Sequence, residues 1–362
     1  MMGKMDDSNV RLKHADEVLC RLSDVRYNYT WITPINIEEE FIAFTTRNGS
    51  YDPQFKYRDI DVKEHIKELE ALEIPTSTKF GQLFEDIRQH FLIEARALDN
   101  IGGATFDTIP LFGRVSGDLL TEAKRILNQP VPDTPEPVKS ISSRELGQML
   151  IDAISSYGLE GWTIEYNPAF LANASISSGN RTVRVKDGMF FSQKRAKKLI
   201  YHEIGTHVLR AENGFAQDYG ILAHGLPHYL PTEEGLAGYN ERLQGIDDSS
   251  ILRNYATRVI ATSVAADSGF RDVYEAVRPF VEDDRRAFMV AARAKRGLGD
   301  TSRPGGYLKD HSYLQGKLLI ERFVENGGDI KKLYAGKIGV EHLWLVDEGH
   351  IKPPQMLPDF LE

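Results

Sequence analysis

"LIYHEIGTHVLRAENG", residues 199–214, is the stretch that decides the fold of this 362-residue chain. Its two histidines, His202 and His207, are five positions apart and enclose Glu203 and Gly205. Successive residues of a regular α-helix are rotated by about 100°, so side chains five positions apart lie about 140° apart and face different ways. A π-type turn takes up one extra residue and brings such positions back to nearly the same face. We therefore predict a π-type turn or another break around Gly205, because glycine tolerates such a distortion.

The glutamate between the two histidines indicates what the pair does. Two histidines on one helix are more often surface or core residues than metal ligands. In zinc hydrolases with an HExxH helix, however, two imidazoles bind the metal and the adjacent glutamate acts as general base. Glu203 occupies that position. The pattern therefore predicts that His202 and His207 bind Zn²⁺ and that Glu203 is catalytic.

A catalytic zinc ion usually has three protein ligands and one open position for water, so a third ligand is required. The segment "YLPTEEGLAGYNERLQG", residues 229–245, is predicted to form a helix and offers Glu233, Glu234 and Glu241. The same segment is also typical of an ordinary helix start, with Thr232 as the cap and acidic residues in the first turn. The residues by themselves leave the third ligand open.

Hydrophobic periodicity organises the first part of the chain. Apolar residues recur at three- and four-residue spacing, which predicts helices at residues 61–72, 80–98 and 116–127. Residues 128–140 contain four prolines, which cannot continue a helix. We interpret them as the linker between a mostly helical region, residues 1–135, and a catalytic domain, residues 136–362.

After the linker the pattern changes. A helix is predicted at residues 142–158, and alternating residues predict two strands at 162–167 and 181–185. A long helix is expected to start near Ser192, and the chain is expected to be helical from Glu233 to about residue 325. The predicted fold is therefore α+β and mostly helical, with a small β-sheet beside the metal-binding helix.

Composition excludes several classes of function. With 44 basic and 53 acidic residues, the net charge is −9, which favours neither a nucleic-acid partner nor an anionic membrane surface. The single cysteine, Cys20, cannot form an intrachain disulfide and suits a reducing compartment. No apolar stretch is long enough for a signal peptide or a membrane span. We expect a cytoplasmic protein, and the sequence does not indicate its oligomeric state.

The two motifs resemble those of a known family. "HEIGTHVLR" followed by "TEEGLA" is similar to the HExxxH and QEGLA motifs of the tyrosine carboxypeptidase-like zinc metallopeptidases, the relatives of the microtubule-associated tyrosine carboxypeptidase. "DPQFKY", "GGYLKDHSYLQG" and the closing "LP" follow in the family's order, so the resemblance extends over nearly the whole chain. It implies a gluzincin-like fold, with zinc bound by His202, His207 and Glu234 and with Glu203 as general base. Glu233 replaces the glutamine of QEGLA, which adds a negative charge but removes no expected ligand.

The resemblance implies a metallocarboxypeptidase that removes a C-terminal residue, tyrosine or another aromatic, from a peptide or protein tail. Such an enzyme must neutralise the free α-carboxylate of its substrate, which requires an arginine or lysine near the metal. Lys309 is the first candidate, although it could equally be an ordinary surface lysine. Arg181 and Arg184 are alternatives on an expected edge strand, which could pair with an extended peptide.

Further side chains are expected around the site. A histidine or tyrosine should assist the reaction, and the candidates are Tyr229, His224, His228 and Tyr313. Arg210 is expected to hold a carboxylate that supports the site.

Two other functions stay open. The first is a zinc aminopeptidase or dipeptidyl peptidase, because dipeptidyl peptidase III uses a similar HExxGH motif with a downstream glutamate. The second is a non-hydrolytic regulatory protein that keeps the zinc as a structural element. An intact Glu203 favours catalysis, since a structural site needs no base. An aminopeptidase would require carboxylates for the substrate amine, whereas a carboxypeptidase requires a basic group.

Overall fold

The computed structural model describes residues 7–23, 31–130, 138–168, 170, 172–246 and 249–361. The first part is helical, as expected, with α1 Asp7–Leu22, α2 Ile37–Thr46, α3 Lys63–Ala71, α4 Lys79–Asp99, α5 Ile109–Phe112 and α6 Gly117–Leu127. The side chains of Thr78 and Ser116 cap α4 and α6 by accepting the N–H of Gly81 and Leu119. The three helices predicted from periodicity are confirmed. The predicted linker lies largely outside the described residues, so the division into two regions stays a prediction.

Two small sheets follow helix α7, Ser143–Ser156. Strand β1, Ile141–Ser142, pairs antiparallel with β5, Phe190–Phe191. The larger sheet contains β2 Thr163–Asn167, β3 Ala174–Ser177 and β4 Thr182–Lys186, in the order β2-β4-β3. Strand β4 is parallel to β2 and antiparallel to β3.

The two predicted strands are therefore confirmed, but the expectation that β4 is an edge strand was wrong. The short strand β3, which the sequence analysis did not identify, covers the side of β4 that was taken to be open. Because both edges of β4 are occupied by backbone hydrogen bonds, a peptide cannot add to this strand. The substrate-binding argument for Arg181 and Arg184 loses its basis.

The segment predicted to bind the metal is one continuous helical rod of changing geometry. Helix α8, Gln193–Leu199, starts after Ser192, whose side chain accepts the N–H of Arg195. It continues as a π-helix, η2 Ile200–Val208, and ends as α9, Leu209–Phe215. Ile204 and Val208 of the π-helix are buried in one cluster with Val183 and Val185 of β4. The sheet thus lies beside the helix that carries His202 and His207, as predicted.

The rest of the chain is mostly helical. Its elements are η3 Gly220–Ala223, α10 Leu230–Leu243, α11 Ser249–Ala265, α12 Phe270–Val277, η4 Arg278–Phe280, α13 Asp284–Lys295, η5 Leu308–His311, α14 Ser312–Glu325, η6 Ile330–Ala335, η7 Val340–His342, α15 Trp344–Asp347 and η8 Asp359–Leu361. Helix α10 starts two residues before the expected cap, Thr232. That cap was therefore wrong, and the Thr232 hydroxyl instead accepts the N–H of Val340 at 3.0 Å.

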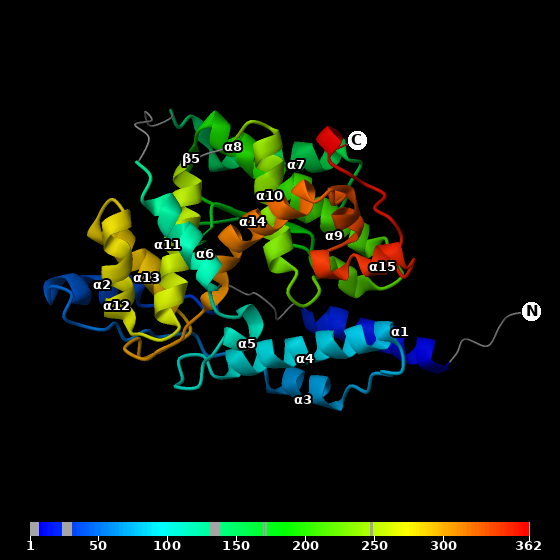
Figure 1. Ribbon diagram of the computed structural model, residues 1–362, viewed down its shortest axis with the longest axis horizontal. Helices are drawn as coiled ribbons and strands as arrows, with labels where there is room; N and C mark the ends of the chain where they lie inside the picture. Colours follow the sequence, from blue (N-terminus) through cyan, green and yellow to red (C-terminus); the bar gives the residue numbers. More distant parts are fainter. Residues whose placement is uncertain are drawn as a thin grey trace, which may run out of the picture.

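Helices α10 and α14 lie side by side at the centre of the molecule (Figure 1). A Cβ on Gly235 of α10 would lie 2.1 Å from the carbonyl oxygen of Gly316. A Cβ on Gly316 of α14 would lie 2.0 Å from the carbonyl oxygen of Pro231. The two backbones therefore touch, which explains the glycines of "EEGLA" and "YLQG" and fixes Glu234 relative to the start of α14.

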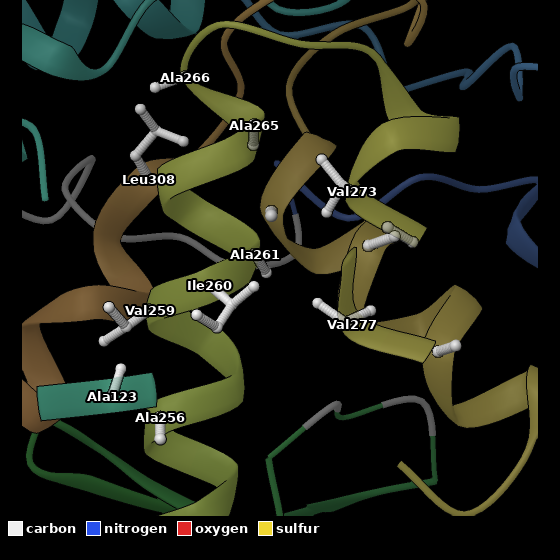
Figure 2. Close-up of a cluster of buried hydrophobic side chains, with 14 of the residues drawn as sticks. Ala123, Ala256, Val259, Ile260, Ala261, Ala265, Ala266, Val273, Val277 and Leu308 are labelled. Atoms are coloured by element: carbon white, nitrogen blue, oxygen red, sulfur yellow. The ribbon is translucent and has the colours of Figure 1, made fainter. Parts of the chain in front are cut away.

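A buried apolar cluster holds the segment before α14 in place. In Figure 2, Val259 of α11 lies on the side of the helix that faces Leu308 and Ala123, and Ile260 lies on the side that faces Val277. Leu308 is 1% exposed and begins η5, so its packing fixes the position of the next residue, Lys309. None of the helices in the described part of the chain combines the length and apolar character that crossing a bilayer requires.

Candidate metal centre

Within the described residues, His202, His207 and Glu234 form a group whose ligand atoms all lie within 4.8 Å of one another. The two imidazole rings have their centroids 4.9 Å apart and are inclined by 82°. Nε2 of His202 is 3.6 Å from a carboxylate oxygen of Glu234. Of the three glutamates that the sequence left open, Glu234 is the one that faces both histidines.

The π-helix is what brings the two histidines together, and the predicted π-type turn is confirmed. The Thr206 hydroxyl donates to the carbonyl of Tyr201 at 3.2 Å, and the Tyr334 hydroxyl donates to the carbonyl of Gly205 at 2.9 Å. The side-chain amide of Asn240 donates to both hydroxyls at 2.7 Å. This buried network adds hydrogen bonds to two carbonyls inside the π-helix, those of Tyr201 and Gly205.

The space around residue 205 does not require a glycine. A Cβ at this position would have its nearest neighbour at 3.9 Å, and the residue is not among those with positive φ. Neither space nor a positive φ therefore requires glycine at this position, and the hydrogen bonds of Thr206, Tyr334 and Asn240 stabilise the turn.

The other ring nitrogen of each histidine contacts a carboxylate of α10. Nδ1 of His202 is 2.7 Å from Glu241, and Nδ1 of His207 is 2.7 Å from Glu233. Each Nε2 is thereby left to face the centre of the group. Arg210 forms an ion pair with Glu233, which confirms its expected role of holding a carboxylate beside the site.

Two buried lysines complete this network, and the sequence analysis identified neither of them. Lys198 lies 2.9 Å from Glu241, and Lys337 lies 3.4 Å from Glu233. Nothing in the sequence marks them among 44 basic residues. Only the packing of α8 and of the segment after η6 against α10 brings them to the site.

Charges around the group control its protonation. Burial opposes the charged form of His202, but Glu234, Glu241 and Glu203 raise its pKa to about 10. Burial likewise opposes ionisation of Glu234, but Lys309 and the two histidines lower its pKa to about 2. A metal ion bound here would have to displace a proton from His202, whereas Glu234 is already an anion.

Glu203 lies in the same π-helix and is 5% exposed. Its carboxylate has no hydrogen-bond or ion-pair partner in the described part of the chain. The neighbouring glutamates differ in this respect, because each of them contacts a histidine and a cation. Glu203 is thus the carboxylate that is available to accept a proton.

Lys309 is not a surface lysine. Its ammonium group lies 3.5 Å from Glu234, and the residue is 4% exposed. The next residue, Asp310, is fully buried in ion pairs with Arg293 and Arg296, which anchors this segment. The Lys309 nitrogen is also 5.9 Å from the ring centre of Tyr313. The structure therefore brings Lys309 and Tyr313 to the metal group.

The remaining candidates have other contacts. Arg184 contacts Glu165 at 3.3 Å, and Arg181 contacts Glu212 at 2.7 Å. The His224 ring nitrogen lies 2.6 Å from the Ser23 hydroxyl, and the His228 ring packs against His90. Tyr229 is buried with its ring over Gly225, where an added Cβ would lie 2.4 Å away. None of the contacts just described involves His202 or His207.

The donor set fits a zinc ion. Zinc accepts imidazole nitrogen and carboxylate oxygen at about 2.0–2.2 Å in tetrahedral geometry, which separates neighbouring ligand atoms by roughly 3.3 Å. The 3.6 Å between His202 and Glu234 is close to this separation. Two histidines and one glutamate are also a donor set of catalytic zinc hydrolases.

Comparisons with known proteins identify the family to which the chain belongs. The family model described as microtubule-associated tyrosine carboxypeptidase matches residues 42–362. The mouse protein named "Putative tyrosine carboxypeptidase MATCAP2" is 26% identical over 340 residues, which are 92% of this chain and 58% of that protein. The mouse protein named "Microtubule-associated tyrosine carboxypeptidase 1" is 38% identical over 128 residues, 34% of this chain and 27% of that protein.

A human protein of the latter name is 33% identical over 163 residues, 44% of this chain and 33% of that protein. The chain thus spans 58% or less of the length of these relatives. The family match nevertheless begins within α2, extends through η8 and includes every residue of the metal group. The chain belongs to the microtubule-associated tyrosine carboxypeptidase family.

Proposed function

We propose that this protein is a zinc-dependent carboxypeptidase that removes a C-terminal residue, tyrosine or another aromatic, from a peptide or protein tail. The observation that carries the proposal is the buried group of His202, His207 and Glu234, with Glu203 in the same π-helix and Lys309 beside it. The names of the family and of its relatives support a carboxypeptidase. We place the reaction in the cytoplasm, since the free Cys20 suits a reducing compartment.

The chemistry is divided between the metal and the protein. When bound, zinc would supply a Lewis acid that lowers the pKa of water and polarises the scissile carbonyl. Glu203 accepts the proton of the attacking water and delivers it to the leaving amine. Its burial keeps bulk water away from this proton transfer, and in the described part of the chain no hydrogen bond or ion pair occupies its oxygens.

The balance of buried charges around the metal group favours a substrate whose bound terminus is negatively charged. Four carboxylates and four cations are buried around the group, namely Glu203, Glu233, Glu234, Glu241, Lys198, Arg210, Lys309 and Lys337. With both histidines neutral, these charges cancel, so a bound divalent cation leaves an uncompensated positive charge. A substrate α-carboxylate and the oxyanion of the transition state would both be stabilised by it. Lys309 would bind the α-carboxylate, and Tyr313 would lie beside it.

The aminopeptidase alternative is less well supported. A substrate amine needs a carboxylate without another cationic partner, whereas Glu233, Glu234 and Glu241 each contact a histidine and a lysine or arginine. The non-hydrolytic alternative gives Glu203 no role. Burying a carboxylate without a hydrogen bond or ion pair costs free energy, and a purely structural zinc site would gain nothing from it. Both alternatives are excluded if the protein hydrolyses peptides from the C-terminus.

The test compares peptides that differ only at the C-terminus. Mass spectrometry should detect loss of the last residue from free-acid peptides ending in tyrosine, and amidated peptides should react much more slowly. Glu203→Gln should keep its zinc and lose roughly 10²- to 10⁴-fold in rate, because the general base is removed. Equal turnover of amidated and free peptides would contradict the carboxypeptidase, and full activity of Glu203→Gln would contradict the mechanism.

A further inference from the structure

The Nδ1 atoms of His202 and His207, which point away from the centre of the metal group, each contact a carboxylate of the same helix, α10. Glu233 and Glu241 of α10 stand on either side of Glu234, and each lies 2.7 Å from one Nδ1. At this distance each carboxylate accepts a hydrogen bond from Nδ1–H. A histidine protonated at Nδ1 has its lone pair on Nε2, which is the nitrogen that faces the group.

Each of these carboxylates also contacts buried cations with its second oxygen. Glu241 divides its oxygens between His202 at 2.7 Å and Lys198 at 2.9 Å. Glu233 bonds His207 with Oε1 and Arg210 with Oε2, and Lys337 lies 3.4 Å from Oε1. An unpaired carboxylate would be costly at these positions, so the cations allow both glutamates to stay ionised.

The cations beside Glu233 connect the metal group to the C-terminal part of the chain. Arg210 is fully buried, and its guanidinium donates to the carbonyls of Leu333, Gly336 and Ile338. Lys337 comes from the same segment. The segment from 333 to 338 therefore supplies or holds both positive charges that face Glu233.

We propose that Glu233 and Glu241 are positioning residues that fix both histidines in the Nδ1–H form, with Nε2 directed at the metal. We further propose that Lys337 compensates the charge that Glu233 introduces where the QEGLA motif has glutamine. The inference rests on the proposed zinc site but not on peptide hydrolysis. Carboxylates that orient metal-bound histidines in this way typically change metal affinity by 10- to 100-fold when removed.

The first experiment measures the zinc dissociation constant of the full chain by competition with a chromophoric chelator. Glu241→Ala removes the acceptor of His202 and should weaken zinc binding roughly 10- to 100-fold. Glu241→Gln keeps an acceptor oxygen and should restore most of the affinity. The matched control is Glu212→Gln, because Glu212 is a buried carboxylate that bonds Trp162 and Arg181 and no histidine. The control should bind zinc like the wild type.

The outcomes separate the two proposals. Zinc affinity unchanged in Glu241→Ala, or equally weak in the Ala and Gln variants, overturns the positioning role. A wild type that binds zinc but hydrolyses no peptide overturns the proposed function alone. Nitrogen-15 NMR of labelled histidines in the zinc-loaded wild type gives a readout without any variant. Nδ1–H signals for His202 and His207 are expected, and metal bound at either Nδ1 overturns the inference.

The second experiment tests charge compensation by a double-mutant cycle on the same zinc dissociation constant. Glu233→Gln keeps an oxygen for His207 but leaves Lys337 and Arg210 without their carboxylate, so zinc binding should weaken roughly tenfold or more. Adding Lys337→Met removes the excess charge, and the double variant should bind zinc more tightly than Glu233→Gln alone. Strictly additive effects of the two substitutions would overturn the compensation by Lys337.

Discussion

At the scale of single residues, Lys309 illustrates how burial decides the role of a charge. Lys309 is 4% exposed and contacts Glu234 at 3.5 Å, and an ammonium group can contact more than one carboxylate at once because it has three donor hydrogens. A substrate carboxylate can therefore join the pair without breaking it. We predict that Lys309→Gln lowers kcat/KM for free-acid peptides roughly 10- to 150-fold, because hydrogen bonds to charged groups contribute about 1.5–3 kcal/mol.

The measurement is a series of initial rates on free-acid and amidated peptides, together with zinc analysis. Lys309→Gln should lose much of the preference for free acids while keeping one zinc per chain. Lys317→Gln is the matched control, since Lys317 lies on the following helix and pairs with Glu321 at the surface. An undiminished preference for free acids in Lys309→Gln would assign the α-carboxylate to another residue.

His342 carries a pH dependence that is separate from the site. It is 8% exposed, its Nδ1 accepts the N–H of Gly339 at 3.0 Å, and burial together with His228 lowers its pKa to about 4. The folded state keeps this imidazole neutral, whereas the unfolded state binds a proton below about pH 6.5. Its contribution to stability is therefore full above pH 6.5 and is lost as the pH falls toward 4.

The expected loss is about 3 kcal/mol over that whole range. Urea unfolding of the wild type and of His342→Gln at pH 7 and pH 4.5 isolates this contribution. The free energy of unfolding of the wild type should fall by about 2 kcal/mol more than that of the variant. Parallel losses in both proteins would show that His342 titrates normally in the folded state.

At the scale of secondary structure, the sequence predicts helix starts and the π-type turn well, but it does not predict how the strands pair. Three predicted helices begin after a serine that caps them, namely Ser116, Ser142 and Ser192. The five-residue spacing of the two histidines required the π-type turn. The order of the strands depends on the four-residue strand β3, whose sequence carries too little pattern to be recognised. Lys198 and Lys337 reach the site only through tertiary packing, which the hydrophobic periodicity of the sequence does not predict.

Substitutions of the two motif glycines, Gly205 and Gly235, are expected to have different effects on stability and on zinc binding. A Cβ on Gly205 meets nothing closer than 3.9 Å, whereas a Cβ on Gly235 meets the Gly316 carbonyl at 2.1 Å. Gly205→Ala should therefore keep zinc and change the free energy of unfolding by no more than about 1 kcal/mol, since alanine is the better helix former. Gly235→Ala must push α10 and α14 apart, which should cost about 1–3 kcal/mol or more.

Both variants should be measured by zinc titration and by urea unfolding. Separation of α10 from α14 also moves Glu234 away from Lys309, so Gly235→Ala is expected to bind zinc more weakly than Gly205→Ala. The reverse order would mean that the π-helix, and not the contact of the two helices, limits the geometry of the site.

At the scale of the whole molecule, the proposed zinc joins elements that are distant in sequence. It would be held by η2 and α10, which η5 and the segment after η6 support through Lys309 and Lys337. Because such a site exists only in the folded chain, zinc at 100 times its dissociation constant should stabilise the fold by about 2.7 kcal/mol. A chelator should lower the Tm of the wild type and leave that of His202→Ala unchanged. Equal Tm values with and without zinc would contradict a site formed only on folding.

The N-terminal helices are part of the same buried structure. Phe84, Ile87 and Phe91 of α4 belong to one apolar cluster with Ile221 and Leu222, which follow the metal-binding helix. In Figure 1, α1, α3 and α4 form a layer along one side of the molecule. Burying a large apolar side chain contributes about 1.5–3 kcal/mol, so losing this layer would remove far more free energy than a typical protein has to spare.

We therefore predict that residues 136–362 do not fold when produced alone, although they contain every ligand of the proposed zinc site. The full chain should unfold in one transition, with tryptophan fluorescence and circular dichroism giving the same midpoint. The fragment should be digested rapidly by a protease that leaves the full chain intact, because its cluster around Ile221 and Leu222 would be exposed. A stable fragment that binds zinc would instead establish the C-terminal part as an independent domain.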